Sequence, residues 1–249
     1  MAVPPGGRLW GTDTLVSCFL AQSSHKRVVV AIDGPSGAGK STIARRLAAR
    51  LGFTYIDTGA MYRAVALWAS RQGIDTADMH RAEQLALAAR IELAPGRIVL
   101  NGEDVTEAIR TPEMSNGASK ISAISGVRRA MVAKQREIGE QTSVVMEGRD
   151  IGTVVFPSAD VKIFLDASPE ERVRRRHAEL AAKGQTISLE QLAAEMRERD
   201  ERDSTRADAP LTQAPDAVYV DSSGMGIEDV EEAILRIVRS RVTNGKEIA

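Results

Sequence analysis

Apolar residues along this chain gather either in short continuous runs or on stripes that recur every three to four positions. The run Arg27 to Asp33 is rich in β-branched residues and precedes a glycine, which is typical of a strand buried in a parallel sheet. Lys40 to Leu51 has a helical stripe and stops at Gly52. Phe53 to Ile56 predicts a second strand, and Asp57 to about Arg71 predicts a second helix. Strand and helix therefore alternate.

The pattern changes between residues 75 and 110. A helix is predicted over Asp78 to Arg90, and the residues after it break at Pro95-Gly96 and Asn101-Gly102, two dipeptides that favour hairpin turns. Three short strands lie around these turns, namely Ile91 to Leu93, Arg97 to Leu100 and Glu103 to Val105. We expect a small antiparallel sheet inserted into an otherwise parallel fold.

Strand and helix alternate again in the second half of the chain. Two helix starts carry capping signals, Ser168-Pro169 with Glu171 and Ser188 with Gln191. The pattern predicts helices over Pro112 to Ala123, Gly126 to Glu140, Ser168 to Lys183 and Ile227 to Arg241, and strands over Val144 to Met146, Val161 to Leu165 and Ala217 to Val220. This order predicts an α/β fold of three layers, with a central parallel sheet covered on both faces.

One motif joins the first strand to the first helix. Gly34 to Ser41 reads GPSGAGKS, which matches G-x-x-x-x-G-K-[ST] at every fixed position. In such a P-loop the backbone amides hold phosphates, Lys40 reaches the β- and γ-phosphates, and the Ser41 hydroxyl can ligate Mg²⁺. Asp33 either helps to position magnesium or only forms a turn. We expect a P-loop NTPase fold whose ATP site contains Gly34, Pro35, Ser36, Gly37, Ala38, Gly39, Lys40, Ser41 and Thr42.

Composition and charge narrow the classes of partner. The chain has 33 Lys and Arg against 34 Asp and Glu, so it lacks the broad positive field of a nucleic-acid-binding protein. Cys18 is the single cysteine, which excludes an internal disulfide and favours a reducing compartment. The apolar run Leu15 to Ala21 is short, so residues 1–26 read as a flexible extension rather than a signal peptide. We expect a cytoplasmic monomer that binds small molecules and neither nucleic acid nor membrane.

Five separated blocks carry a further pattern. They are Asp33 to Lys40 (DGPSGAGK), Asp57 to Arg63 (DTGAMYR), Glu147 to Pro157 (EGRDIGTVVFP), Lys162 to Ala167 (KIFLDA), and Glu198-Arg199-Asp200 through Arg206. In this order they resemble the signature of the bacterial cytidylate kinases. The resemblance implies ATP-dependent, Mg²⁺-dependent phosphorylation of CMP and dCMP. It also implies a core (27–57, 143–184 and 212–249), a monophosphate-binding part with the β insert (about 58–142) and a mobile helical lid (about 185–211).

The resemblance also assigns residues to the acceptor. The implied substrate-binding set comprises Thr58, Arg63 and Arg149 for the acceptor phosphate, Ser119, Arg128 and Asp150 for cytosine, Arg199 and Asp203 for the ribose, and Ser36 and Arg206. An ionised Asp150 would accept a hydrogen bond from the N4 amino group of cytosine and would repel the oxygen that uracil carries there. The candidates also have purely structural alternatives: Asp57 and Thr58 could cap the next helix, Arg128 and Arg129 could be solvated surface, and Asp150 could pair with a nearby arginine.

The lid can be argued from helix periodicity alone. Steps of four and three residues from Leu192 reach Met196, Arg199, Asp203 and Arg206, so one helix face changes from apolar to charged. Arg202 lies one turn from Arg199, and clustered guanidiniums repel one another unless an anion lies among them. Taken alone, this segment would also suit a salt-bridged surface helix. Beside a P-loop we expect the catalytic cations to be Lys40, Arg199, Arg202 and Arg206.

Two other functions would also use a P-loop. A related kinase could phosphorylate another small acceptor, such as UMP, AMP or shikimate. A nucleotide-dependent binding module could hydrolyse ATP only when a macromolecule docks. If ADP release requires CMP and no macromolecule, this result favours phosphorylation of CMP over both the related kinase and the binding module.

Overall fold

The computed structural model describes residues 27–75, 77–94 and 96–243. The extension predicted for residues 1–26 lies outside this part of the chain. Among the described helices, none combines the length and the apolar character needed to cross a bilayer.

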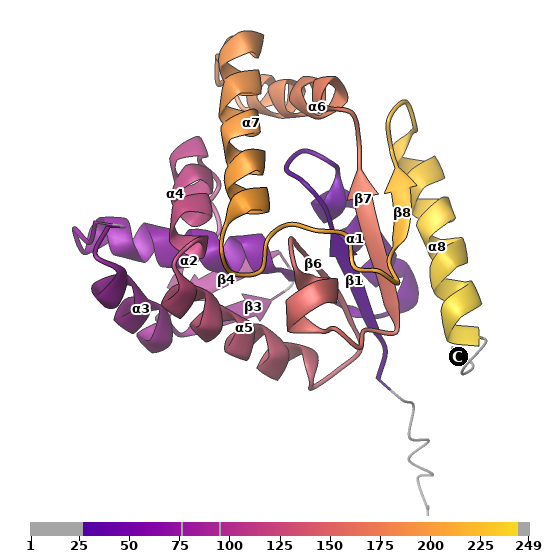
Figure 1. Ribbon diagram of the computed structural model, residues 1–249, viewed down its shortest axis with the longest axis horizontal. Coiled ribbons are helices and arrows are strands. Elements are labelled where there is room, and N and C mark those ends of the chain that lie inside the picture. The colour runs from indigo at the N-terminus through magenta and orange to yellow at the C-terminus, as the bar shows by residue number, and fades with distance from the viewer. Residues whose placement is uncertain (1–26, 76, 95, 244–249) are drawn as a thin grey trace, which may run out of the picture.

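A five-stranded parallel sheet forms the centre of the molecule (Figure 1). Its strands lie in the order β2-β6-β1-β7-β8, and each neighbouring pair is parallel, as the sequence predicted. They are β1 (Val29–Asp33), β2 (Thr54–Asp57), β6 (Val144–Gly148), β7 (Val161–Asp166) and β8 (Val218–Asp221). The register pairs Asp33 with Gly148 and Asp57 with Glu147, so polar residues meet at the carboxyl ends of the strands. Ligands of open α/β sheets bind at this end.

Helices cover both faces of the sheet and complete the three predicted layers. α1 (Lys40–Leu51) and α8 (Ile227–Thr243) contact each other on one face, over a core that includes Ile32 and Ile234. On the other face, α5 (Ser125–Gly139) and a single π-helical turn, η1 (Ile151–Val155), bury Met146. Because both faces are covered, β1 and β6 are buried along their whole length, and each begins with an apolar run that ends at an acidic residue, Asp33 or Glu147.

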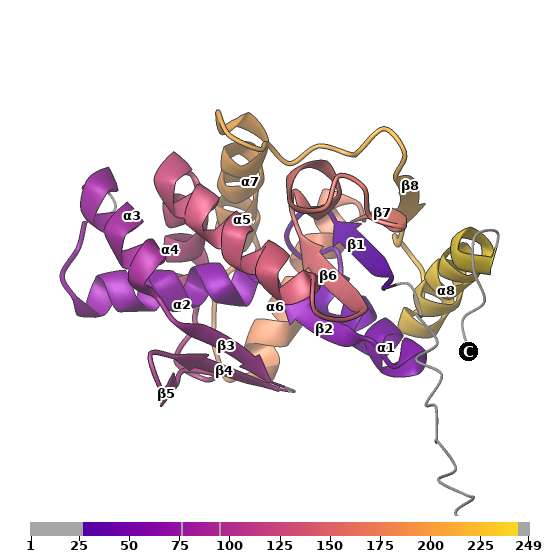
Figure 2. The ribbon, with the colours of Figure 1, turned by 90° about the horizontal axis from the view of Figure 1, so that it is seen from below.

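A second group of helices carries the predicted insert. α2 (Thr58–Arg71) packs against α4 (Pro112–Ser122), and α3 (Met79–Ala88) packs against α5. They enclose a core of their own, which includes Met61, Ile121 and Met131. The strands β3 (Ile91–Ala94), β4 (Arg97–Leu100) and β5 (Glu103–Asp104) form an antiparallel sheet in that order, which confirms the insert. Figure 2 shows this small sheet apart from the central one.

The lid segment forms a helical pair with the helix before it. α6 (Pro169–Ala182) and α7 (Leu189–Thr205) contact each other at the top of Figure 1. Both predicted caps are present, since Ser168 accepts a hydrogen bond from the N–H of Glu171 (3.2 Å) and Ser188 accepts one from Gln191 (3.1 Å). α7 also contacts α4, so the lid reaches across to the helices that carry the insert.

Candidate active site

The P-loop runs from the end of β1 to the start of α1 with glycines where the backbone requires them. Gly34 approaches β7 so closely that an added Cβ would lie 1.9 Å from the carbonyl oxygen of Leu165. Gly39 precedes the helix at φ 91°, a left-handed conformation that favours glycine, and gives the first amides of α1 no side-chain cap. Uncapped amides at a helix N-terminus bind anions, so the loop has the geometry of a phosphate site.

Lys40 is buried at the base of this loop. Its Nζ donates to the carbonyl oxygen of Pro35 at 2.6 Å. Burial, and next the positive charge of Arg149, lower the pKa of Lys40 to about 7, against the attraction of Glu147. A phosphate anion beside Nζ would favour the charged form, so the nucleotide would supply the negative charge that this ammonium lacks.

Glu147 connects the P-loop to β2. Its Oε2 accepts a hydrogen bond from the Ser41 hydroxyl at 3.0 Å, and its Oε1 accepts one from the Tyr55 hydroxyl at 2.5 Å. The side chain is buried, and burial raises its pKa. The sequence singled out the block that contains Glu147 but gave this residue no role. The pairing of β2 with β6, which brings Tyr55 and Glu147 together, could not be read from local pattern.

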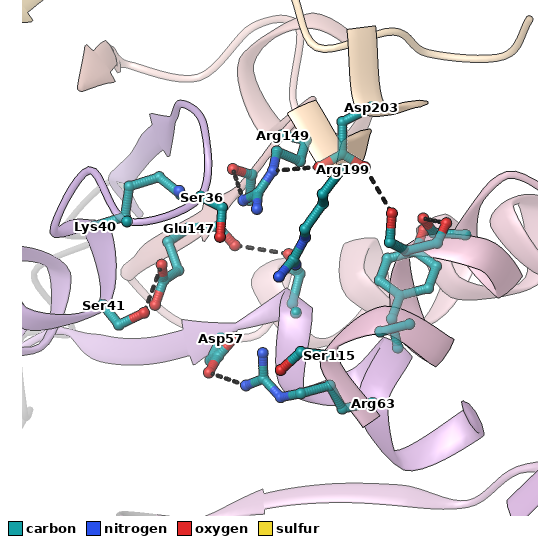
Figure 3. A pocket seen from close by; sticks show the side chains of 18 of the residues that line it. Ser36, Lys40, Ser41, Asp57, Arg63, Ser115, Glu147, Arg149, Arg199 and Asp203 are labelled. Atoms are coloured by element: carbon teal, nitrogen blue, oxygen red, sulfur yellow. Dashed lines mark hydrogen bonds and ion pairs between the residues drawn. The ribbon is translucent and has the colours of Figure 1, made fainter. Parts of the chain in front are cut away.

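Three arginines surround the space next to the P-loop. Arg63 on α2 pairs with Asp57 at 2.9 Å, and Arg149 donates through Nε to Asp203 at 2.9 Å. Figure 3 shows Arg199 reaching from α7 into the space between Arg149 and Arg63. The Nε of Arg199 is buried and has no hydrogen-bond partner, and burial, with Arg149 next, lowers the pKa of Arg199 to about 10. Such a cluster of cations is unfavourable until an anion enters it.

A carboxylate lies at the other end of the cavity. Asp150 is buried, with its Oδ2 2.9 Å from a guanidinium nitrogen of Arg128 and its Oδ1 3.8 Å from one of Arg206. Arg128 also lies over the ring of Tyr62, with 5.8 Å from Cζ to the centroid. The structural alternative considered for Asp150, an ion pair with arginine, is therefore present in this structure. The pair also fixes the orientation of the carboxylate.

All ten predicted substrate-binding residues line one cavity of about 210 Å³, which they share with Lys40, Ser41 and Thr42. Thr58 lies here as the first residue of α2, where its hydroxyl donates to the carbonyl oxygen of Glu147 at 2.7 Å. The helix cap is the preceding Asp57, which accepts a hydrogen bond from the N–H of Ala60. Asp57, which was considered only as a cap, also lines the cavity. The other lining residues to which the sequence gave no role are Gly59, Tyr62, Ser115, Ala118, Ser122, Glu147, Gly148, Arg176 and Glu179.

Arg202 differs from the other predicted catalytic cations in its location. It lines a neighbouring cavity of about 530 Å³ between α4 and the lid, not the cavity that contains Lys40. Its Nη1 donates to the Ser119 hydroxyl at 2.9 Å, and its Nη2 pairs with Glu198 at 2.5 Å. Arg202 thus contacts Ser119, which lines the cavity that contains Lys40, but does not line that cavity itself.

Asp33 anchors the π-helical turn that the sequence did not predict. Its Oδ1 accepts a hydrogen bond from the N–H of Ile151 at 2.8 Å, and its Oδ2 accepts one from Gly152 at 2.7 Å. This buried carboxylate joins the strand that leads into the P-loop to the turn that follows Asp150. π-helical turns are rare and occur often at functional sites.

The pKa of Asp33 leads to a prediction about stability. Burial raises this pKa from 3.8 to about 6, so the folded chain holds more protons than the unfolded chain between these pH values. The contribution of Asp33 to stability is therefore largest at low pH and is lost as pH rises through about 6. We expect the difference in unfolding free energy between wild type and Asp33→Asn to fall by about 2 kcal/mol between pH 4 and 7. Urea denaturation at several pH values measures this difference, and a constant difference contradicts the prediction.

A family profile described as cytidylate kinase matches residues 30–240. The chain belongs to the cytidylate kinase family. It is 76% identical over 232 residues to the cytidylate kinase of Solibacter usitatus (strain Ellin6076), which covers 92% of this chain and 100% of that protein. It is 52% identical over 223 residues to the cytidylate kinase of Syntrophotalea carbinolica, which covers 87% and 94%. The resemblance carried by the five sequence blocks is confirmed.

A solved structure adds a likeness of fold. The crystal structure of an uncharacterized protein from Eubacterium ventriosum has a TM-score of 0.50 and 10% identity, and the match covers 86% of this chain and 99% of that one. At this identity the likeness concerns the fold alone, in keeping with the α/β architecture of the cytidylate kinase family member described here.

Proposed function

We propose that this chain transfers the γ-phosphoryl group of ATP to CMP or dCMP and releases ADP with CDP or dCDP. The observation that carries this proposal is a single cavity with a P-loop and a cluster of cations at one end and the buried carboxylate of Asp150 at the other. The cations suit the phosphates of both nucleotides. The carboxylate suits the N4 amino group of cytosine.

The proposed reaction is an in-line displacement at the γ-phosphorus. An oxygen of the acceptor phosphate forms a bond to this phosphorus, and the bond from phosphorus to the oxygen bridging to the β-phosphate breaks. The acceptor oxygen is already anionic at neutral pH, so no general base is needed. Catalysis then depends on position and charge. Lys40, the P-loop amides and Arg199 would stabilise the phosphoryl group in transit, while Arg63, Arg149 and Thr58 would hold the acceptor phosphate.

The residues beside the P-loop also suit Mg²⁺. The Ser41 hydroxyl and the Glu147 carboxylate lie 3.0 Å apart, and magnesium prefers oxygen ligands of this kind together with phosphate oxygens and water. We assign Ser41 as the direct ligand and Glu147 as the carboxylate that orients it. Bound Mg²⁺ would neutralise charge on the β- and γ-phosphates. Both oxygens of Asp33 are engaged by η1, so we place Asp33 outside this site.

The proposal assigns a task to each part of the chain. Residues 27–57, 143–184 and 212–249 form the core that binds ATP, residues 58–142 bind the acceptor, and residues 185–211 form the lid. Closure of the lid would exclude water from the phosphates and so suppress hydrolysis of ATP. We further propose a cytoplasmic monomer whose partners are ATP, CMP and dCMP rather than nucleic acid or membrane.

A panel of single nucleotides tests the proposed function. ADP formation is followed with ATP, Mg²⁺ and, one at a time, CMP, dCMP, UMP, AMP and shikimate. We expect fast release with CMP and dCMP and slow release with the other acceptors. Release that requires a macromolecule, or that is fastest with another acceptor, contradicts the proposal.

Selectivity for the base gives a further prediction. Asp150→Ala removes the carboxylate that would bind the N4 amino group, and a lost contact of this kind typically costs about 1–3 kcal/mol of discrimination. We expect the ratio of kcat/KM for CMP to that for UMP to fall about 5- to 160-fold, which is that cost as a ratio. Steady-state assays with both substrates measure it. An unchanged ratio rejects the role assigned to Asp150.

A further inference from the structure

Two charged residues outside the substrate cavity join the lid to the P-loop. Arg172 on α6 is 8% exposed. Its Nη1 donates to the carbonyl oxygen of Ser36 at 3.0 Å and also to Oδ2 of Asp200 on α7. Its Nε donates to the carbonyl oxygen of Ala167, just after β7, at 3.1 Å. One guanidinium therefore contacts the P-loop, the lid helix and the end of a core strand.

Asp200 closes the same junction from the other side. Its Oδ1 accepts a hydrogen bond from the backbone N–H of Ser36 at 3.4 Å. Both backbone groups of Ser36 are thus bound, the carbonyl by Arg172 and the N–H by Asp200. Gly37 is equally close to the lid, because an added Cβ would lie 3.0 Å from the carbonyl oxygen of Arg172 and 3.0 Å from the terminal methyl of Met196. The P-loop thus lies directly against α6 and the lid helix α7.

The place of Asp200 in α7 suggests what this junction does. The preceding residue is Arg199, whose side chain enters the cavity between Arg149 and Arg63 (Figure 3). Successive residues of a helix point about 100° apart, so α7 can contact the P-loop through Asp200 while Arg199 points into the cavity. A change in the angle of α7 would move the guanidinium of Arg199, and a misplacement of about 1 Å can cost about 100-fold in rate.

We propose that Arg172 and Asp200 are positioning residues, which hold α7 against the P-loop so that Arg199 is aimed at the phosphoryl group in transit. This inference rests on the proposed function and extends it to two residues that do not line the substrate cavity. The alternative is that the buried pair only maintains the fold. The two roles differ in which measurement changes, kcat or thermal stability.

Asp200→Asn tests the proposal, because it keeps the shape of the side chain and removes the charge that faces Arg172. We expect kcat for CMP phosphorylation to fall about 10- to 100-fold, as expected for a misplaced catalytic group. The KM values for CMP and ATP and the unfolding temperature should stay close to those of wild type. Glu201→Gln is the matched control, since it removes an exposed carboxylate at the next position of α7 and should leave kcat unchanged.

The pair is tested as a unit by Arg172→Met alone and together with Asp200→Asn. If the two residues act through one junction, the double variant is no slower than the slower single variant. Arg172→Lys should recover only part of the activity of Arg172→Met, because an ammonium lacks the planar fork that bridges three acceptors. The proposal is overturned if the two losses of kcat multiply in the double variant and each loss is accompanied by a lower unfolding temperature.

Wild-type protein is assayed in parallel, so that two kinds of failure can be distinguished. If wild type releases no ADP with CMP, the proposed function fails, and the positioning role fails with it. If wild type is active and Asp200→Asn is equally active, only the positioning role is rejected.

Discussion

Arg199→Ala is expected to lower kcat for CMP phosphorylation by about 10³- to 10⁵-fold, the range found when an arginine that contacts a transferring phosphoryl group is removed. Arg199 enters the cavity beside the P-loop, and its buried Nε has no hydrogen-bond partner. A phosphoryl group with developing negative charge would supply that partner. Steady-state assays at saturating ATP and CMP measure the loss.

The control for Arg199 lies on the same helix. Arg197 is exposed, and its Nε donates only to the carbonyl oxygen of Ala193, one turn earlier in α7. Arg197→Ala removes the same charge from the lid without changing the cavity, and kcat should be unchanged. If Arg199→Ala lowers kcat no more than Arg197→Ala does, Arg199 has no part in the transfer.

Lys40→Ala is expected to lower kcat by about 10²- to 10³-fold, the loss that follows removal of one preorganised donor at a site of developing charge. The unfolding temperature near pH 7 should not fall with it. Burial depresses the pKa of Lys40 to about 7, so the free protein gains little from a charged ammonium at this position. Activity and thermal stability measured on one preparation give both results. A variant with near-normal turnover refutes the role of Lys40.

Lys162 is a matched control with the opposite expectation. Like Lys40, it is buried and donates to the carbonyl oxygen of a proline five residues earlier, Pro157, at 2.6 Å. Unlike Lys40, it has a carboxylate partner, Asp216, at 2.8 Å. Lys162→Ala removes a buried side chain together with its bonds to Pro157 and Asp216, and should lower the unfolding temperature while kcat of the folded protein is preserved. The two lysines thus separate a catalytic ammonium from a structural one.

The layers of the fold could be predicted because each depends on local pattern. Buried strands begin with an apolar run, helices carry a stripe, and the turns at Gly96 and Asn101-Gly102 mark the antiparallel insert. η1 could not be predicted, because the hydrogen bonds that hold it come from Asp33, more than a hundred residues earlier. Such contacts depend on strand order, which a sequence pattern does not contain.

The candidate site was predicted more from ordered motifs than from geometry. Their spacing predicted that Arg199, Asp203 and Arg206 would face one site. Arg199 and Asp203 lie on α7, Arg206 follows its last residue, and all three line one cavity. Arg202 was grouped with them, yet it lies about 60° around the helix from Arg199 and contacts α4 instead. The junction of Arg172 and Asp200 with Ser36 gave no local signal, because its members come from three segments that only the folded chain brings together.

The separate core beneath the insert has a consequence for damage to this enzyme. The helices that we propose hold the acceptor enclose their own apolar cluster, whereas the P-loop adjoins the clusters of the central sheet. A smaller side chain at Ile121 or Met131 would therefore destabilise these helices before the central sheet. On mild warming such a variant would lose affinity for CMP while it still bound ATP. It would therefore become inactive at a temperature below that of global unfolding.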